Sequence, residues 1–344
     1  MIDPIESAEE AGLKYVTDEV PGFKRKKKGK GFVYLDEKNA VLKKKAHLDR
    51  IKELVIPPAW RDVWICRSPR GHLQVTGRDA RNRKQYRYHP KWNEQRNETK
   101  FNQLLNLSKK IPLLKKQLNQ DLSLRGMPKE KVLATVIKVM LITKSRVGNS
   151  TYAEENESYG LTTLLNKHAK ISSEKIRLSF RGKSGVDHDI SFKDPQLSKI
   201  VKKCQELPGQ ELFAYHGENG EVVDVTSTHV NEYLKKVTGE EITAKDLRTW
   251  GGTCKAIEIL VQECPEKLSE AEWKQRHVSV VKETARLLHN TVSVCRKYYI
   301  HPIILEADKE GTLHELWKSC RRCPKNLEKE ENLLLKILSL NTAA

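Results

Sequence analysis

The segment LRTWGGT (residues 247–253) and the later segment LLHNTVSVCRKYYIHP (residues 287–302) decide how this chain is interpreted. A threonine suited to capping precedes the first segment and predicts a helix over 245–262 that carries Arg248. A long helix is expected over roughly 271–289, and a shorter helix that holds two adjacent tyrosines follows it. An arginine, a polar cluster and tyrosines therefore lie on successive elements of a helical C-terminal third.

The chain as a whole is strongly basic. Its 344 residues include 63 Lys and Arg against 45 Asp and Glu, which gives a formal net charge of +18. An excess of this size favours a polyanionic partner, and nucleic acid is commoner than a membrane surface. No apolar run approaches the ~18 residues that span a bilayer, and the acidic N-terminus is unlike a signal peptide, so a cytoplasmic location without membrane contact is expected.

The cysteines favour a reducing compartment. There are seven of them, an odd number, and they are scattered along the chain. Cys320 and Cys323 form one C-x-x-C pair, but no second pair stands at zinc-site spacing. No metal site is therefore predicted.

Residues 1–99 are predicted to form a small β-rich domain. Residues 1–30 end in FKRKKKGKG, which is interpreted as a mobile basic arm. Beyond it, short runs rich in Val, Ile and aromatic residues predict strands, at 31–35, 63–66, 72–77 and 84–89. A helix that stops at Pro57-Pro58 is expected between the first two strands.

The last of these strands has the character of a DNA-facing surface. Lys84, Tyr86 and Tyr88 are two residues apart, so they share one face of a strand. Five cations lie within residues 78–87. A half-exposed strand with basic decoration is the alternative, but the local charge density favours contact with DNA.

Residues 100–344 are predicted to form a larger, mainly helical domain. Residues 131–146 have an apolar helical stripe with Arg146 at its C-terminal end. Residues 173–192 change to a period of two and predict a hairpin with Lys183 in its tip. The tail, 324–344, is predicted to be an amphipathic helix packed on the domain. The fold class is therefore α+β.

These residue types suit the transesterification of a phosphodiester. A tyrosine hydroxyl can attack phosphorus, and the non-bridging oxygens of the pentacoordinate state then gain negative charge. Arginine forks stabilise that charge, and an amide or imidazole can add a hydrogen bond. A lysine on a mobile loop can protonate the leaving oxygen. With enough fixed cations around the phosphate, neither a metal nor another cofactor is expected.

Several segments resemble the type IB DNA topoisomerases, in particular their compact poxvirus and bacterial branch. The similar segments follow family order over roughly residues 31–302, and they are PPAWRDVWIC (57–66), TGRDARNRKQYRYHP (76–90), SRVGNSTYAEENESYGLTTLLNKH (145–168), FRGKSG (180–185), KDLRTWGGT (245–253) and HNTVSVCRKYYIHP (289–302). The resemblance implies a C-shaped clamp, in which the antiparallel β domain and a catalytic domain of the tyrosine recombinase and topoisomerase IB fold close around duplex DNA.

The resemblance also implies roles for individual residues. Five positions match the family's catalytic set, with Tyr299 as the nucleophile: Arg146, Lys183, Arg248, Asn290 and Tyr299. Five others match family DNA contacts: Gln85, Tyr86, Tyr88, Tyr152 and Lys245. The implied enzyme relaxes supercoils through a 3′-phosphotyrosyl intermediate without ATP. A monomer is expected, because nothing in the sequence demands a dimer and a clamp can work alone.

The register of the reactive segment is ambiguous by spacing alone. Asn290 lies nine residues before Tyr299, and His289 lies nine residues before Tyr298. The family nucleophile follows a basic-basic-X sequence and precedes an aliphatic-X-Pro sequence, and only Tyr299 satisfies both. Many members have histidine where this chain has Asn290, and an asparagine donates a neutral hydrogen bond that does not titrate.

Two alternatives remain open at this point. A tyrosine recombinase shares the catalytic set, although its signature usually has histidine near the position of Trp250 and lacks the β-rich segment over 76–90. A non-enzymatic basic DNA-binding protein would explain the charge without the tyrosine. Taken singly, each candidate residue has a commonplace role in a cap, an ion pair or a core, and it is their joint order that favours the enzyme.

Overall fold

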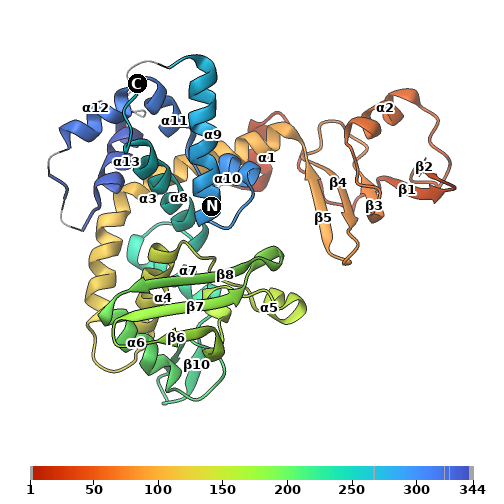
Figure 1. Cartoon of the computed structure of the whole chain (residues 1–344). Helices are drawn as coiled ribbons and strands as arrows, with labels where there is room; N and C mark the ends of the chain where they lie inside the picture. The colour runs from red at the N-terminus through yellow and green to blue at the C-terminus, as the bar shows by residue number, and fades with distance from the viewer. Residues whose placement is uncertain (1–2, 266–267, 321, 325, 341–344) are drawn as a thin grey trace. The chain divides into compact units, whose positions relative to one another are not determined.

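The computed structural model describes residues 3–265, 268–320, 322–324 and 326–340 (Figure 1). The chain divides into two compact units, residues 1–100 and 101–344. Within the described ranges, no helix has both the length and the apolar character that a membrane crossing requires.

A five-stranded antiparallel sheet is the centre of the first unit. Its strand order is β2-β1-β3-β4-β5, and the strands are β1 (Phe23–Lys28), β2 (Gly31–Leu35), β3 (Arg61–Ile65), β4 (Leu73–Arg78) and β5 (Lys84–Tyr88). Helix α2 (Lys45–Glu53) adds Ile51 to the buried cluster of Phe23, Val63, Ile65 and Val75. The antiparallel N-terminal sheet is thus confirmed.

The prediction of a mobile basic arm over residues 1–30 is wrong. Residues 4–10 form helix α1 (Pro4–Glu10), and the Lys/Arg run is strand β1, paired along its length with β2. Phe23 is buried, and the guanidinium of Arg25 donates to the carbonyl oxygens of Pro57 (3.0 Å) and Trp60 (2.7 Å). Phe23 and Arg25 are the inward positions of a period-two pattern, and the many charged residues around them made this pattern hard to recognise in the sequence.

The second unit is mainly helical. Helix α3 (Pro90–Leu122) begins in the first unit, ten residues before the expected helical region, with proline in its first turn. Helix α4 (Lys129–Thr143) is buried on most sides, as expected of a central helix. It packs against α6 (Pro195–Gln205), α7 (Ser227–Thr238) and α8 (Ala244–Leu260).

A small antiparallel sheet covers one part of this unit. Its order is β6-β7-β8, with β6 (Ala169–Ile171), β7 (Lys175–Arg181) and β8 (Asp187–Lys193), and α6 packs against it (Figure 1). Strands β7 and β8 are the predicted hairpin, with η3 (Lys183–Gly185) at its tip. The remaining short elements are α5 (Ser150–Asn156), η1 (Leu161–Thr163), η2 (Asn166–His168), β9 (Ala214–His216) and β10 (Val222–Asp224).

Five helices complete the chain: α9 (Glu270–Leu287), α10 (Val292–Tyr298), α11 (Pro302–Lys309), α12 (Thr312–Ser319) and α13 (Lys329–Leu340). Helix α13 packs against α8. The predicted packing of the C-terminal tail on the domain is thus found within residues 326–340, a part of the tail that the structure describes. The indole of Trp250 on α8 donates to Glu331 on α13 at 3.4 Å, and Glu331 also pairs with Lys115 on α3.

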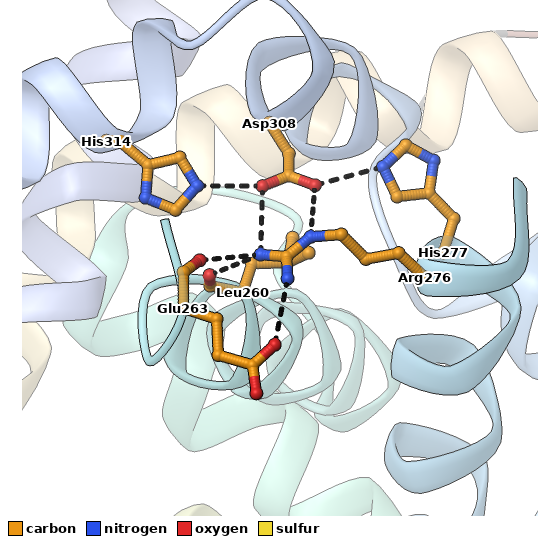
Figure 2. A network of polar contacts seen from close by, with 6 residues as sticks. All are labelled: Leu260, Glu263, Arg276, His277, Asp308 and His314. Carbon is orange, nitrogen blue, oxygen red and sulfur yellow. Dashed lines mark hydrogen bonds and ion pairs between the residues drawn. The ribbon is translucent and has the colours of Figure 1, made fainter. Parts of the chain in front are cut away.

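One buried carboxylate joins several of these helices (Figure 2). Asp308 on α11 accepts hydrogen bonds from Arg276 Nε (3.1 Å) and His277 Nε2 (3.0 Å) on α9, and from His314 Nε2 (3.0 Å) on α12. Arg276 also donates to the carbonyl oxygen of Leu260 at the end of α8 (2.7 Å). Burial alone would raise the pKa of Asp308, but the bonds from His277 and Arg276 hold this pKa below its ordinary value. The network ties α8, α9, α11 and α12 together.

Candidate active site

Arg248 is the centre of the candidate site. It lies on α8, where an N-terminal capping box joins Thr243 and Asp246, and only 4% of its surface is exposed. Its guanidinium donates to two backbone carbonyl oxygens, those of Lys144 and Leu288. Arg248 therefore joins the segments that follow α4 and α9 to α8.

The end of α4 differs from the sequence prediction. The helix was expected to continue to Arg146, but it ends at Thr143 because Lys144 adopts the left-handed conformation, with φ of 56°. The side chain of Lys144 lies against Gly251, where an added β-carbon would come within 2.7 Å of the lysine Cδ. This turn directs the Lys144 carbonyl to Arg248 and places Arg146 in the following loop.

Arg146 and Asn290 are in direct contact. The guanidinium of Arg146 donates from Nη2 to the amide oxygen of Asn290. Asn290 follows α9 after a left-handed residue, His289 (φ of 46°), and its backbone N–H bonds the carbonyl oxygen of Ala285 at 3.0 Å. The Asn290 Nδ2 and the Arg248 Nε are buried and have no hydrogen-bond partner among the described residues. Both are donors that a bound anion can use.

The two arginines form a cationic pair without a balancing carboxylate. Burial and the nearby charge of Arg146 together lower the pKa of Arg248 to about 10, while Tyr299 acts in the opposite direction. Burial also lowers the pKa of Arg146. Neither forms an ion pair with an acid in the part of the chain that the structure describes. Neighbouring buried cations of this kind favour an anionic ligand.

Tyr299 lies beside this pair. It was expected on the short helix, but it stands just after α10, with φ of −130° and its N–H bonded to the Cys295 carbonyl oxygen at 2.9 Å. The Arg248 Cζ lies 5.2 Å from the centroid of the Tyr299 ring. The Tyr298 ring instead lies near Lys297, whose Nζ is 5.3 Å from its centroid.

Helix α8 also holds the backbone of Tyr299. The Thr253 hydroxyl lies 2.9 Å from the Thr249 carbonyl oxygen and 3.4 Å from that of Tyr299, between which it shares its proton, and it accepts a bond from the N–H of His301 at 3.2 Å. A β-carbon added to Gly252 would lie 2.6 Å from the same carbonyl oxygen. Gly252 is thus required for the close approach of Tyr299 to α8.

Lys183 stands apart from these four residues. It is exposed at the tip of the β7–β8 hairpin and makes no hydrogen bond or ion pair with any described residue. The structure therefore brings together Arg146, Arg248, Asn290 and Tyr299, and it leaves Lys183 on a solvent-facing turn.

The candidate DNA-contact residues are at the surface. Tyr86 and Tyr88 are 47% and 39% exposed, and their rings stack with centroids 6.1 Å apart, on one face of β5 as predicted. Gln85 donates from Nε2 to Asp79 at 3.0 Å. Tyr152 on α5 and Lys245 on α8 are exposed as well.

Sequence reasoning missed several residues that build the site. The carbonyls of Lys144 and Leu288 have no side-chain pattern by which they could be found. Gly252 lies four residues after Arg248, hence on the same helix face, and this spacing was an available signal. His188, buried on β8 beside His289, shares the inward face of its strand with Ile190, which was likewise an available signal.

Comparison with known proteins identifies the family to which the chain belongs. The family of the eukaryotic DNA topoisomerase I catalytic core matches residues 89–324, more than half of the chain. The bacterial DNA topoisomerase IB N-terminal domain matches residues 31–79.

Individual relatives belong to the same group. The DNA topoisomerase 1B of Acanthamoeba polyphaga mimivirus is 33% identical over 293 residues, covering 83% of this chain and 87% of the relative. The DNA topoisomerase I of Monkeypox virus is 26% identical over 242 residues, covering 69% and 73%. Among solved structures, the XerH site-specific recombinase bound to difH substrate covers 59% of this chain and 52% of its own, with a TM-score of 0.35 and 14% identity, too remote to support a conclusion. By its family matches and its mimivirus relative, this chain belongs to the type IB DNA topoisomerases.

Proposed function

We propose that this enzyme relaxes supercoils of either sign in duplex DNA by cutting and resealing one strand, with Tyr299 as the nucleophile. Membership of the type IB family supports the reaction class. The single observation that carries the residue assignment is the convergence of Arg146, Arg248, Asn290 and Tyr299, from four separate segments, on one partly buried cationic site.

The proposed first step is attack of the Tyr299 hydroxyl oxygen on a phosphodiester. The phenolic proton passes to solvent water, a P–O bond to tyrosine forms, and the bond to the 5′-oxygen breaks. Arg146, Arg248 and Asn290 donate to the non-bridging oxygens while their charge grows. The vacant donors Arg248 Nε and Asn290 Nδ2 are suited to this task.

The leaving 5′-oxygen needs a proton, and Lys183 is the proposed donor. Its exposed position on a hairpin tip suits a group that reaches the leaving oxygen only when DNA is bound. The products are a 3′-phosphotyrosyl bond and a free 5′-hydroxyl. The ester conserves the energy of the broken linkage, so strand rotation and religation proceed without ATP.

Duplex DNA is the proposed substrate, bound by a monomer. The net charge of +18 and the exposed side chains of Tyr86, Tyr88, Tyr152 and Lys245 support contact with the phosphate backbone. Gln85 is proposed to exchange its bond with Asp79 for one with DNA.

Tyr299→Phe tests the assignment. The variant should bind supercoiled plasmid but neither relax it nor form a covalent adduct, because the nucleophilic oxygen is gone. Tyr298→Phe is the matched control, since its ring lies by Lys297, and it should retain both activities. An adduct in Tyr299→Phe would refute the assignment, and loss of the adduct only in Tyr298→Phe would move the nucleophile by one residue. The plasmid should lack recombination sites, because a recombinase would leave such a plasmid supercoiled.

A further inference from the structure

An aromatic contact joins the hairpin that carries Lys183 to the turn that carries Asn290. His188 on β8 is only 4% exposed, and its ring stacks on Phe180 of β7 with centroids 4.6 Å apart and planes at 10°. The other side of the contact is His289, whose ring centroid lies 3.9 Å from that of His188. His188 therefore lies between the hairpin and the segment after α9.

The tip of the hairpin rests on the same ring. A β-carbon added to Gly182 would lie 2.4 Å from His188 Nε2, so only glycine allows the backbone to lie this close. Gly182 directly precedes Lys183, and its N–H bonds the Val186 carbonyl oxygen at 2.7 Å to close the turn. The contact between Gly182 and the His188 ring therefore fixes the backbone position of Lys183.

The turn on the other side of the His188 ring contacts both arginines of the candidate site. His289 has a left-handed backbone and lies between Leu288, whose carbonyl accepts from Arg248, and Asn290, which accepts from Arg146. Burial, together with the nearby His289 and the two arginines, lowers the pKa of His188 to about 4. The ring is therefore neutral at working pH, and its Nδ1 has no partner among the described residues. Its contribution is one of shape.

We propose that His188 is a positioning residue, whose ring, seated between Gly182 and His289, holds the hairpin tip beside the phosphate site so that Lys183 can reach the leaving oxygen. This inference rests on the proposed function, in which Lys183 is the acid. It predicts that loss of the His188 ring impairs proton donation specifically. Loss of a residue that only stabilises the hairpin would not impair proton donation in this selective way.

DNA with a bridging 5′-sulfur at the cleavage site distinguishes a residue that positions the proton donor from a residue that only stabilises the hairpin. A thiolate leaves without a proton donor because a thiol has a pKa of about 8.5, far below that of an alcohol. His188→Ala should slow single-turnover cleavage of ordinary DNA by about 10²-fold, the scale of a lost general acid. On the sulfur-containing DNA its rate should be close to that of the wild type. His188→Phe, which keeps a ring, should recover most of the lost rate.

Two further variants keep the inference independent of folding. Gly182→Ala puts a methyl group into the His188 ring and should show the same selective loss. Ile176→Ala removes a buried side chain at the other end of the hairpin, so it should lower the melting temperature without a sulfur-dependent change. Melting curves of all variants identify any that are unfolded. If His188→Ala is unfolded, Gly182→Ala takes its place in the comparison.

Lys183→Ala is assayed first, because it tests the acid itself. If sulfur does not rescue Lys183→Ala, the assignment of Lys183 in the proposed function fails. If sulfur rescues Lys183→Ala but neither His188→Ala nor Gly182→Ala, the proposed function stands and the positioning role of His188 is refuted. The role is also refuted if His188→Ala cleaves ordinary DNA at the wild-type rate.

Discussion

Arg248 is held in place by backbone rather than by acids. Its two bonds to the carbonyls of Lys144 and Leu288 orient the guanidinium but leave its positive charge unneutralised. A carboxylate partner would have oriented it as well, but would have competed with the phosphate for the same charge. Orientation by carbonyls therefore preserves the electrostatic attraction for an anion.

The buried His188 and the half-buried His301 make stability depend on pH. Burial lowers the pKa of both His188 and His301 from 6.5 to about 4, and nearby cations also act on His188. Between these values the unfolded chain binds protons that the folded chain does not. The free energy of unfolding should therefore fall by a few kcal/mol as the pH drops from about 6.5 to about 4.

Urea unfolding at a series of pH values measures this loss. His188→Phe removes the contribution of one histidine, so its stability should fall less steeply over the same window. A free energy of unfolding that is unchanged between pH 7 and pH 4.5 would contradict the burial of these rings in the neutral state.

Side chains of the site could be predicted from sequence, whereas its backbone parts could not. The tyrosine, the arginines and the asparagine were found because their segments follow the order of the type IB topoisomerase family. The carbonyl of Lys144 is invisible in the sequence because every residue has a carbonyl, and only the left-handed turn directs this one to Arg248. The catalytic roles of the assembled residues stay predictions until the variants are assayed.

Helix α8 is the element that aligns the arginine with the tyrosine. It presents Arg248, Gly252 and Thr253 to Tyr299, so a change in how closely Tyr299 approaches the helix should alter the reaction. Gly252→Ala would place a β-carbon 2.6 Å from the Tyr299 carbonyl oxygen and force it to move. We expect cleavage to fall by about 10²-fold, the scale of a misplacement near 1 Å.

Gly251→Ala is the matched control for this prediction. Its β-carbon would meet the flexible side chain of Lys144, which can shift more easily than backbone. Both variants gain up to about 1 kcal/mol of helix propensity, so propensity does not distinguish them. Single-turnover cleavage that is equal in the two variants would show that the approach of Tyr299 is not limiting.

The elements themselves were predictable where a periodic pattern was unbroken. The β7–β8 hairpin follows from alternation, and its tip from two glycines that flank Lys183 and Ser184. Strand β1 was missed because its inward positions are Phe23 and Arg25, and an arginine does not register as apolar. The end of α4 was missed because the apolar stripe continues up to the turn at Lys144. A lysine gives no sequence signal for a left-handed residue that ends a helix.

The buried network around Asp308 is expected to support the whole helical unit. Asp308→Asn keeps the size of the side chain but removes the charge that balances Arg276, and it weakens the bonds to His277 and His314. Breaking a buried charge pair in this way should lower the free energy of unfolding by about 3–5 kcal/mol. Urea unfolding followed by circular dichroism measures the change.

Glu263→Gln is the control for that experiment. Glu263 also pairs with Arg276, but its side chain is 84% exposed, so its loss should cost less than about 1 kcal/mol. Similar losses for both variants would show that burial of Asp308 does not set the strength of the network.

The charge of the whole molecule predicts how DNA binding responds to salt. An excess of +18 should release many counterions from the duplex, so affinity should fall steeply as salt rises. Each neutralised phosphate should contribute about −0.9 to the slope of log affinity against log salt. Titration with Tyr299→Phe measures binding without cleavage, and a flat dependence would contradict backbone contact. Composition alone predicted this polyanionic partner, because net charge does not depend on fold.

The cationic pair of Arg146 and Arg248 also affects the stability of the enzyme when no DNA is bound. Without a phosphate, two like charges lie close together inside the protein, and their repulsion lowers the free energy of unfolding. In the proposed mechanism, a bound phosphodiester would supply the missing counter-charge. By mass action, DNA should then protect the enzyme, and DNA-free molecules should be the first to unfold on heating or to be degraded by proteases.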